Sequence, residues 1–253
     1  MKRISIFAAV WCTILPFTAF SQWTHVGQRT WHAFRGGLSL GMNYTLYTGE
    51  IPLLPSPEIQ TFGEGESLNF QAFAFVEKPF SRSIAAGLKV GWDPMSATVE
   101  GNMLEPYRIA DGDGNLYPVR RDHTTDYILR YFTAGGYVKI YPGGGPGFFL
   151  GAGFSVSFLT EKRYVNNATI TEPEWARGAK AQPQTGGLSN TNPMRGSLDI
   201  MIGYEFFYMY GFLSPQLHYN YGFDHPIDAS YADSWGVHNI RLSVAFALPL
   251  YGL

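Results

Sequence analysis

Hydrophobic and polar residues alternate over two long stretches of the chain. Between positions 148 and 159 every even position is apolar, whereas the odd positions are mainly Gly and Ser. Between positions 240 and 250 the even positions are again all apolar, and they alternate with Arg, Ser, Ala and Pro. Successive side chains of a strand point to opposite faces, so a period of two over ten or more residues predicts a long β-strand. The two strands predicted in this way are residues 148–159 and 237–250.

Weaker alternation predicts six more strands, which brings the total to eight. These six are residues 34–44, 68–77, 83–92, 127–141, 196–208 and 212–221. The two faces of residues 68–77 are ambiguous, because Phe73 and Phe75 share a face with polar side chains. In residues 127–141 the alternation changes phase at Gly135-Gly136, which predicts a β-bulge at this point.

The predicted connections alternate between short and long. The short ones lie near residues 78–82, 142–147 and 209–211. The long ones are rich in Pro, Gly, Asn and Asp and lie near residues 45–67, 93–126, 160–195 and 222–236. Short turns at one end and long loops at the other are typical of an outer-membrane barrel. A helical membrane protein is excluded, because no segment after the N-terminus approaches the ~18 uninterrupted apolar residues of a spanning helix.

The charged residues of the predicted strands identify the face that lines the lumen. One face of the sheet is continuously apolar, whereas the other mixes Gly, Ser and Asn with charges. An Arg or Lys that faced lipid at mid-bilayer would cost ~2–4 kcal/mol, so the apolar face must contact lipid. The predicted fold is therefore all-β, an eight-stranded antiparallel up-and-down transmembrane β-barrel. The charged residues predicted to face its lumen are Arg35, Lys89, Arg130, Lys139, Asp199, Glu205 and Arg241.

A barrel of eight strands has an interior that its own side chains can fill. Unpaired charges in such a space are costly, so each acidic side chain should contact a basic one. We expect Asp199 to pair with Arg130, Lys89 or Arg241, near the loop end of the barrel. We expect Glu205 to pair with Arg35 or Lys139, near the turn end. The lumen is predicted to be plugged.

Aromatic residues cluster near both ends of the predicted strands, which is typical of the girdles at membrane–water interfaces. The girdle at the loop end is predicted to contain Tyr44, Trp92, Tyr127, Tyr219 and Trp235. The girdle at the turn end is predicted to contain Tyr141, Phe148, Tyr208, Phe212 and Tyr251.

The N-terminus has the features of a cleaved secretory signal peptide. Lys2 and Arg3 precede an apolar stretch, and small residues stand at Ala19 and Ser21. Cleavage would also remove Cys12, the only cysteine. The predicted organisation is a signal peptide at 1–21, an N-terminal periplasmic segment at 22–33 and a barrel with four long extracellular loops at 34–253.

Composition narrows the possible partners. Charged residues make up 15% of the chain and aromatic residues 16%, against about 25% charged residues in an average protein. The formal net charge is −2, so the basic excess typical of nucleic-acid binding is absent. The partners expected are outer-membrane lipid and a protein that binds the long loops.

These features together resemble the small outer-membrane β-barrels. The OmpA-type and PorT-like "porin family" barrels of the Bacteroidetes/Chlorobi group are the most similar, and the resemblance runs from about residue 34 to the end. The segment YVKIYPGGGPGFFLGAGFSVSFL (137–159) is similar to their central hairpin. The resemblance implies a Gram-negative cell envelope and an outer-membrane location, and it brings no active-site motif. The chain departs from many such barrels in ending with PLYGL instead of a terminal Phe or Trp.

Few residues suggest chemistry. The segment DGDGN (111–115) resembles the start of a calcium loop, but it lacks the Gly and Glu expected at positions 6 and 12 and is interpreted as a polar turn. No metal site and no cofactor are predicted. Candidates for a hydrolytic or lipid-modifying site at the outer rim are Asp122, His123, His218 with Asn220, Asp224, His225, Asp228 and Asp233. We expect a non-enzymatic barrel with a structural, partner-binding or secretion-support role. The alternatives are an outer-membrane hydrolase or lipid-modifying enzyme and a secreted soluble β-barrel.

Overall fold

The computed structural model describes residues 31–48, 65–188, 191–223 and 236–250. The strands of the described residues are β1 (Phe34–Thr48), β2 (Gly65–Pro79), β3 (Ile84–Pro94), β4 (Ala97–Ala110), β5 (Leu116–Ile140), β6 (Phe148–Glu172), β7 (Gln184–Gly187), β8 (Met194–Tyr204), β9 (Phe206–Tyr208), β10 (Gly211–Gly222) and β11 (Gly236–Leu250). A 3-10 turn, η2 (Glu174–Ala176), follows β6. No helix of the described residues is long and apolar enough to cross a membrane.

Eight strands form a closed antiparallel ring, as the sequence predicted. The order around the ring is β1, β2, β3, β5, β6, β8, β10 and β11. The ring closes between its first and last strands, from Phe34 opposite Leu250 to Thr48 opposite Gly236. A closed barrel of the eight predicted strands requires this pairing, because residues 34–44 and 237–250 are its first and last strands. Closure leaves the ring without the unpaired strand edge that cannot face hydrocarbon.

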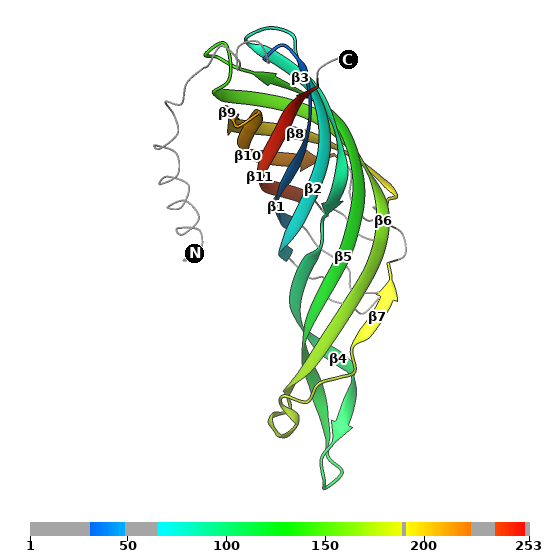
Figure 1. Cartoon of the computed structure of the whole chain (residues 1–253). Helices are drawn as coiled ribbons and strands as arrows, with labels where there is room; N and C mark the ends of the chain where they lie inside the picture. Colours follow the sequence, from blue (N-terminus) through cyan, green and yellow to red (C-terminus); the bar gives the residue numbers. More distant parts are fainter. Residues whose placement is uncertain (1–30, 49–64, 189–190, 224–235, 251–253) are drawn as a thin grey trace.

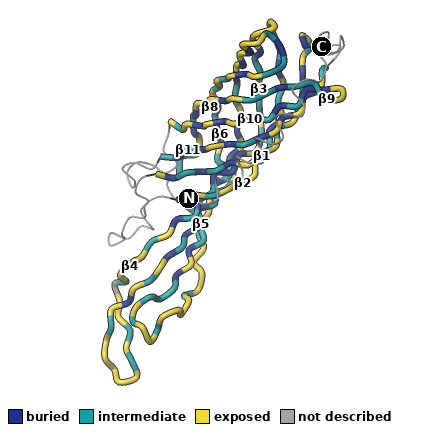
Figure 2. Tube along the Cα trace, turned by 90° about the vertical axis from the view of Figure 1, so that its left-hand side faces the viewer, coloured by how far each residue is buried: buried dark blue, intermediate teal, exposed yellow. Residues whose placement is uncertain are grey.

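Buried and exposed positions alternate along the strands of the ring (Figure 2). The two faces separate apolar from polar side chains in the direction expected for a membrane barrel. Phe154, Ile200 and Val244 are exposed on the outer face. Val156 and Leu242 lie on the same face and are half-buried. In contrast, the charged side chains of the ring interior are buried, except that the Lys89 side chain is 9% exposed. The exposed apolar residues form an apolar belt around the barrel, which is far larger than the patch a soluble monomer tolerates.

β5 and β6 continue well beyond the barrel. Each has 25 residues, whereas a membrane strand needs about 9–11. β4 pairs with the first part of β5, and β7 pairs with the last part of β6. Together these strands form a sheet that projects from one end of the ring (Figure 1); we call it the projecting sheet. We call this end of the barrel the sheet end, and the end with the short β2–β3 and β5–β6 connections the turn end.

The projecting sheet corrects two of the predicted loops. Residues 93–126 and 160–195 were expected to be long loops, yet they contain β4, the start of β5, the end of β6 and β7. Their Pro, Gly, Asn and Asp residues suggested irregular structure. These strands nevertheless form because each pairs with a neighbour along its length, which supplies the backbone hydrogen bonds that an irregular loop would lack.

The bulge predicted at Gly135-Gly136 is absent. β5 pairs without interruption with β3 and β6 across this dipeptide. The apparent change of phase arises because Gly136 lies on the outer face and the aromatic Tyr137 on the inner one. Tyr137 fits there because the inward Gly87 opposite it has no side chain: a Cβ on Gly87 would lie 2.5 Å from the Tyr137 ring.

A bulge does occur in β6, at Thr160. Arg130 of β5 pairs with Glu161, whereas the next residue, Tyr131, pairs with Leu159. The extra residue reverses which side chains of β6 point inward. Odd positions face the lumen before Thr160, and even positions such as Asn166 and Ala168 are buried after it.

Candidate functional site

The turn end of the lumen contains a buried group of four charged side chains, which we call the turn-end charge cluster. Its members are Arg35 (β1), Glu77 (β2), Lys139 (β5) and Glu205 (between β8 and β9). Arg35 Nη1 lies 2.7 Å from Glu205 Oε1 and 3.5 Å from Glu77 Oε1. Lys139 Nζ lies 2.7 Å from Glu77 Oε2 and 3.8 Å from Glu205 Oε2. Two bases thus face two acids, and the cluster has no net charge.

A second group, the sheet-end charge cluster, lies further along the lumen. Its members are Lys89 (β3), Asp93 (β3), Asp199 (β8) and Arg241 (β11). Asp199 lies 2.7 Å from Lys89 Nζ and 3.0 Å from Arg241 Nη1. Arg241 also forms an ion pair with Asp93. The hydroxyl of Ser155 and the side-chain amide of Asn220 donate further hydrogen bonds to Asp199, at 2.6 and 2.8 Å.

The structure thus brings together six of the seven charged residues assigned to the lumen. Arg130 is the exception and corrects the prediction. It shares its face with the exposed Phe132, and its guanidinium pairs with Glu161 on the outer wall. The error follows from the change of phase assumed at Gly135-Gly136, which inverted the preceding part of β5.

Sequence reasoning missed three charged residues of the lumen, Glu77, Asp93 and Arg195. Each continues the polar face of a predicted strand: Glu77 and Asp93 stand at or just beyond the predicted ends, and Arg195 stands just before a predicted start. Extending the alternation by one residue would have found Asp93 and Arg195, whereas Glu77 was missed because the two faces of residues 68–77 were ambiguous. Arg195 donates to the carbonyl oxygen of Val237 and contacts the sulfur of Met95, each at 2.7 Å.

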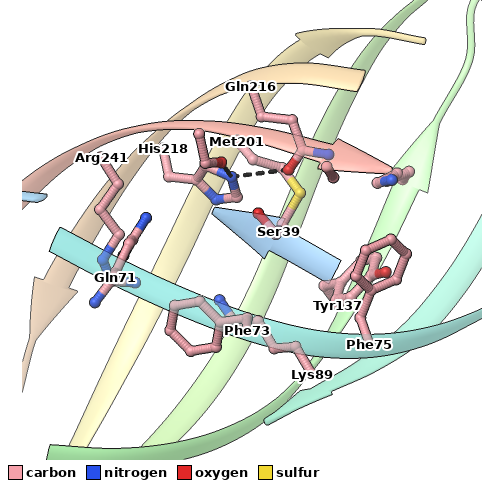
Figure 3. Close-up of a pocket in the computed structure, with 13 residues that line it drawn as sticks. Ser39, Gln71, Phe73, Phe75, Lys89, Tyr137, Met201, Gln216, His218 and Arg241 are labelled. Carbon is pink, nitrogen blue, oxygen red and sulfur yellow. Dashed lines mark hydrogen bonds between the residues drawn. The ribbon is translucent and has the colours of Figure 1, made fainter. Parts of the chain in front are cut away.

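A small cavity lies between the two charge clusters (Figure 3). Its volume is about 40 Å³, which is room for a few water molecules. Lys89, Lys139 and Arg241 line it together with Gln71 and His218. Within the described part of the chain, Gln71 Oε1 and His218 Nδ1 have no hydrogen-bond partner. Both are polar atoms that water in the cavity would satisfy.

Two apolar clusters close the lumen on either side of these charges. The cluster at the turn end is formed by Trp31, Ala85, Tyr137, Tyr141, Phe149, Met201, Phe212 and Ala247. The cluster at the sheet end is formed by Tyr47, Met95, Ala97, Val99, Tyr127, Leu129, Tyr131 and Val237. Side chains therefore fill the lumen over most of its length.

The aromatic residues predicted as girdles divide into three groups. Trp92, Phe148, Tyr208 and Tyr219 are exposed, and Tyr44 is half-buried with its hydroxyl bonded to Glu66. Tyr127, Tyr141 and Phe212 are buried in the apolar clusters of the lumen, so their assignment to the girdles is wrong. Trp235 and Tyr251 lie outside the described residues.

The candidates for rim chemistry are only partly brought together. His123 Nε2 lies 3.1 Å from Glu105 Oε1, and His123 Nδ1 lies 3.3 Å from Asn166 Oδ1. Asp122 points to the other face of the projecting sheet, where it accepts a hydrogen bond from Asn102. His218 is inside the barrel, 2.9 Å from Gln216. The remaining candidates, Asp224, His225, Asp228 and Asp233, lie outside the described residues, as do residues 1–21 of the predicted signal peptide.

The DGDGN segment forms the turn between β4 and β5. Asp111 Oδ1 accepts hydrogen bonds from the backbone amides of Asp113 and Asn115, both at 2.9 Å. The Asn115 side chain and backbone lower the pKa of the Asp111 carboxyl by hydrogen bonding to its charged form. The Asp111 carboxylate thus stabilises the turn through these hydrogen bonds. The described residues contain no group of three or more His, Cys, Asp or Glu that could hold a metal ion.

Comparison with known proteins agrees with this architecture. A family model described as "Outer membrane protein beta-barrel domain" matches residues 20–228. The chain belongs to this family. It is accordingly an outer-membrane protein, and the alternative of a secreted soluble barrel is wrong.

Individual solved structures are more distant. Ail, the attachment invasion locus protein of Yersinia pestis, solved with the heparin analogue sucrose octasulfate, is 11% identical over 85% of this chain and 99% of its own, with a TM-score of 0.34. Neisserial surface protein A is 8% identical over 86% and 97% of the two chains, with a TM-score of 0.34. The outer membrane protease OmpT of Escherichia coli is 10% identical over 87% and 98%, with a TM-score of 0.36. Among curated proteins, no relative matches the chain.

Proposed function

We propose that this protein is a non-enzymatic outer-membrane barrel with a closed lumen, which acts outside the membrane through its projecting sheet. The observation that carries this proposal is the contrast between the two parts: buried charge clusters and apolar clusters fill the lumen, whereas β5 and β6 extend far beyond the apolar belt. Short turns of such barrels face the periplasm, so the sheet end faces outward. The sheet would bind a partner, or support the envelope or secretion. We also propose that the barrel is of the Bacteroidetes type and that its signal peptide is cleaved after residue 21.

A closed lumen predicts the absence of ion flow. Purified protein inserted into a planar bilayer should give little or no current, because two charge clusters and two apolar clusters occupy the lumen and the cavity between the charge clusters is only about 40 Å³. The measurement is single-channel recording over a range of voltages. A large and stable current from the intact protein would contradict the proposal.

Shortening the β4–β5 hairpin tests the role of the projecting sheet. Met103 and Arg121 face each other in register, so residues 104–120 can be replaced by the two-residue turn Asn-Gly, which joins antiparallel strands. The barrel should still insert and stay closed, but it should no longer rescue the envelope-stress, adhesion or secretion defects of a deletion strain. Full rescue by the shortened protein would show that the β4–β5 hairpin is dispensable, and it would contradict the role proposed for it.

A hydrolytic site at the outer rim is the second candidate. It is favoured by one observation, the 3.1 Å contact between His123 and Glu105, which is the imidazole–carboxylate pair that general-base catalysis uses. Under this alternative, the wild-type protein would hydrolyse peptide or phospholipid substrates, and His123→Ala would abolish the reaction. Under the proposed function, neither protein has hydrolytic activity.

A further inference from the structure

Three charged side chains lie together on the outer wall of the barrel, at the edge of the apolar belt. They are Arg130 of β5 and Glu161 and Arg163 of β6. The bulge at Thr160 brings Glu161 and Arg163 to this wall, because an unbroken alternation would turn both into the lumen. The Thr160 hydroxyl donates to the carbonyl oxygen of Arg130 at 2.9 Å, which ties the bulge to β5. We call these three residues the wall triad.

The wall triad leaves donor groups available to a ligand. Arg130 Nη1 lies 2.6 Å from one oxygen of Glu161, and Arg163 Nε lies 2.9 Å from the other. The side chains of Arg130 and Arg163 are 42% and 54% exposed. Each guanidinium has five N–H donors, of which this carboxylate occupies only part. Two positive groups are thus held side by side by one negative group, with a net charge of +1.

The position of the triad corresponds to the lipid headgroup level. Arg130 is one outward-facing position beyond Phe132 of the apolar belt, and its guanidinium carbon lies 5.9 Å from the centre of the Trp92 ring. Tryptophan is enriched at the headgroup level of membrane barrels. Charges on the outer wall are least unfavourable at the interface, where polar headgroups replace hydrocarbon.

We propose that the wall triad binds the phosphate group of an anionic lipid in the outer leaflet. Each guanidinium is a planar group whose several N–H donors match phosphate oxygens, and the triad presents two of them. A lipid fits better than a free phosphate ion, because its acyl chains would pack against the belt directly below, at Phe132 and Phe158. The choice of leaflet depends on the orientation in which the short turns face the periplasm; lipid binding by the triad does not depend on the role proposed for the projecting sheet.

The test compares lipid binding by the full-length protein and a double variant, Arg130→Gln with Arg163→Gln, in detergent micelles. Native mass spectrometry measures the affinity for phosphorylated lipid A, for its dephosphorylated form and for phosphatidylethanolamine. The wild-type protein should prefer phosphorylated lipid A. The double variant should bind it about tenfold more weakly or worse, since it loses charge-assisted hydrogen bonds from two guanidinium groups. Millimolar inorganic phosphate should not displace the lipid.

Arg120→Gln is the matched control. Arg120 lies on the same face of β5, pairs with Glu172 and is 49% exposed, but it stands ten residues from Arg130, about 33 Å along the strand at ~3.3 Å per residue. This variant should bind lipid A as the wild type does, and all variants should unfold at the wild-type temperature. The proposal is overturned if the double variant keeps wild-type affinity, if dephosphorylated lipid A binds equally well, if Arg120→Gln weakens binding as much, or if inorganic phosphate displaces the lipid.

Discussion

Asp199→Ala should lower the free energy of unfolding by about 3–5 kcal/mol, the cost of removing one partner from a buried ion pair. Asp199 is fully buried and contacts both Lys89 and Arg241. Arg241 keeps Asp93 as a partner in the variant, whereas Lys89 loses its only ion-pair partner among the described residues. The ammonium group of Lys89, whose side chain is 9% exposed, would then lack a carboxylate within ion-pair distance. Urea unfolding of the protein in lipid vesicles or micelles measures the difference.

Asp122→Ala provides the control for this experiment. Asp122 is an aspartate in the same kind of antiparallel strand, but it lies exposed on the projecting sheet, with Asn102 as its partner. An exposed substitution of this kind typically changes stability by less than about 0.5 kcal/mol. Equal losses in the two variants would show that the lumen charges do not hold the barrel together. We also expect Asp199→Ala to leave surface binding unchanged, because its contacts are internal.

The alternation of side chains was sufficient to predict the ring but not the projecting sheet. A strand in the membrane needs one apolar face, so residues 148–159 and 237–250 carry an unmistakable period of two. In the parts of β5 and β6 beyond the barrel, one face is largely exposed and the other carries buried polar residues such as His123 and Asn166. Their sequences therefore lack a continuous apolar face, and β4 even contains Pro106. These strands form because they pair with neighbouring strands. The sequence of one strand does not show which strands will pair with it, so the projecting sheet could not be predicted.

The predicted girdles were wrong at three positions, because an aromatic residue near a strand end can lie either on the lipid-facing side or in the lumen. Tyr127, Tyr141 and Phe212 stand near strand ends, where an outward position would place them in a girdle. They point inward because the ends of the lumen need large side chains to close them. Whether such a residue points outward or inward follows from its odd or even spacing to residues of known orientation in the same strand. The phase change assumed at Gly135-Gly136 obscured this spacing for Tyr127 and for Arg130.

The bulge at Thr160 shows a different limit. Alternation alone would place Glu161 and Arg163 in the lumen, with the inward Ser157 and Leu159. A single extra residue reverses the two faces of β6. The Thr160 hydroxyl bonds to the opposite strand at the bulge, but this bond cannot be read from the sequence. The register of two strands, rather than the sequence of one, decides where these charges point.

Trp31→Ala should also destabilise the protein strongly, by about 3–5 kcal/mol, as expected for truncating a buried tryptophan. Trp31 precedes β1 and belongs to the segment predicted to lie in the periplasm, yet it is only 1% exposed in the turn end of the lumen. Its ring packs edge-on against Tyr141, with centroids 5.0 Å apart, and lies 4.2 Å from the Arg35 guanidinium carbon. Its indole N–H donates to the carbonyl oxygen of Ser81 at 3.2 Å. Removing the ring leaves a cavity beside the turn-end charge cluster, which water can enter.

Two measurements distinguish this role from a general effect of losing a tryptophan. Trp175→Ala is the matched control, because Trp175 is 56% exposed in the 3-10 turn η2 that follows β6 and its loss should change the free energy of unfolding far less. Water entry is followed with Ala247→Cys, a thiol placed in the apolar cluster around Trp31; the only natural cysteine is Cys12. Adding Trp31→Ala to this reporter should speed its reaction with a water-soluble thiol reagent, and adding Trp175→Ala should not. If the thiol reacts at the same rate with and without Trp31, the tryptophan does not seal the turn end, and the charge clusters and the other residues of the apolar clusters close the lumen without it.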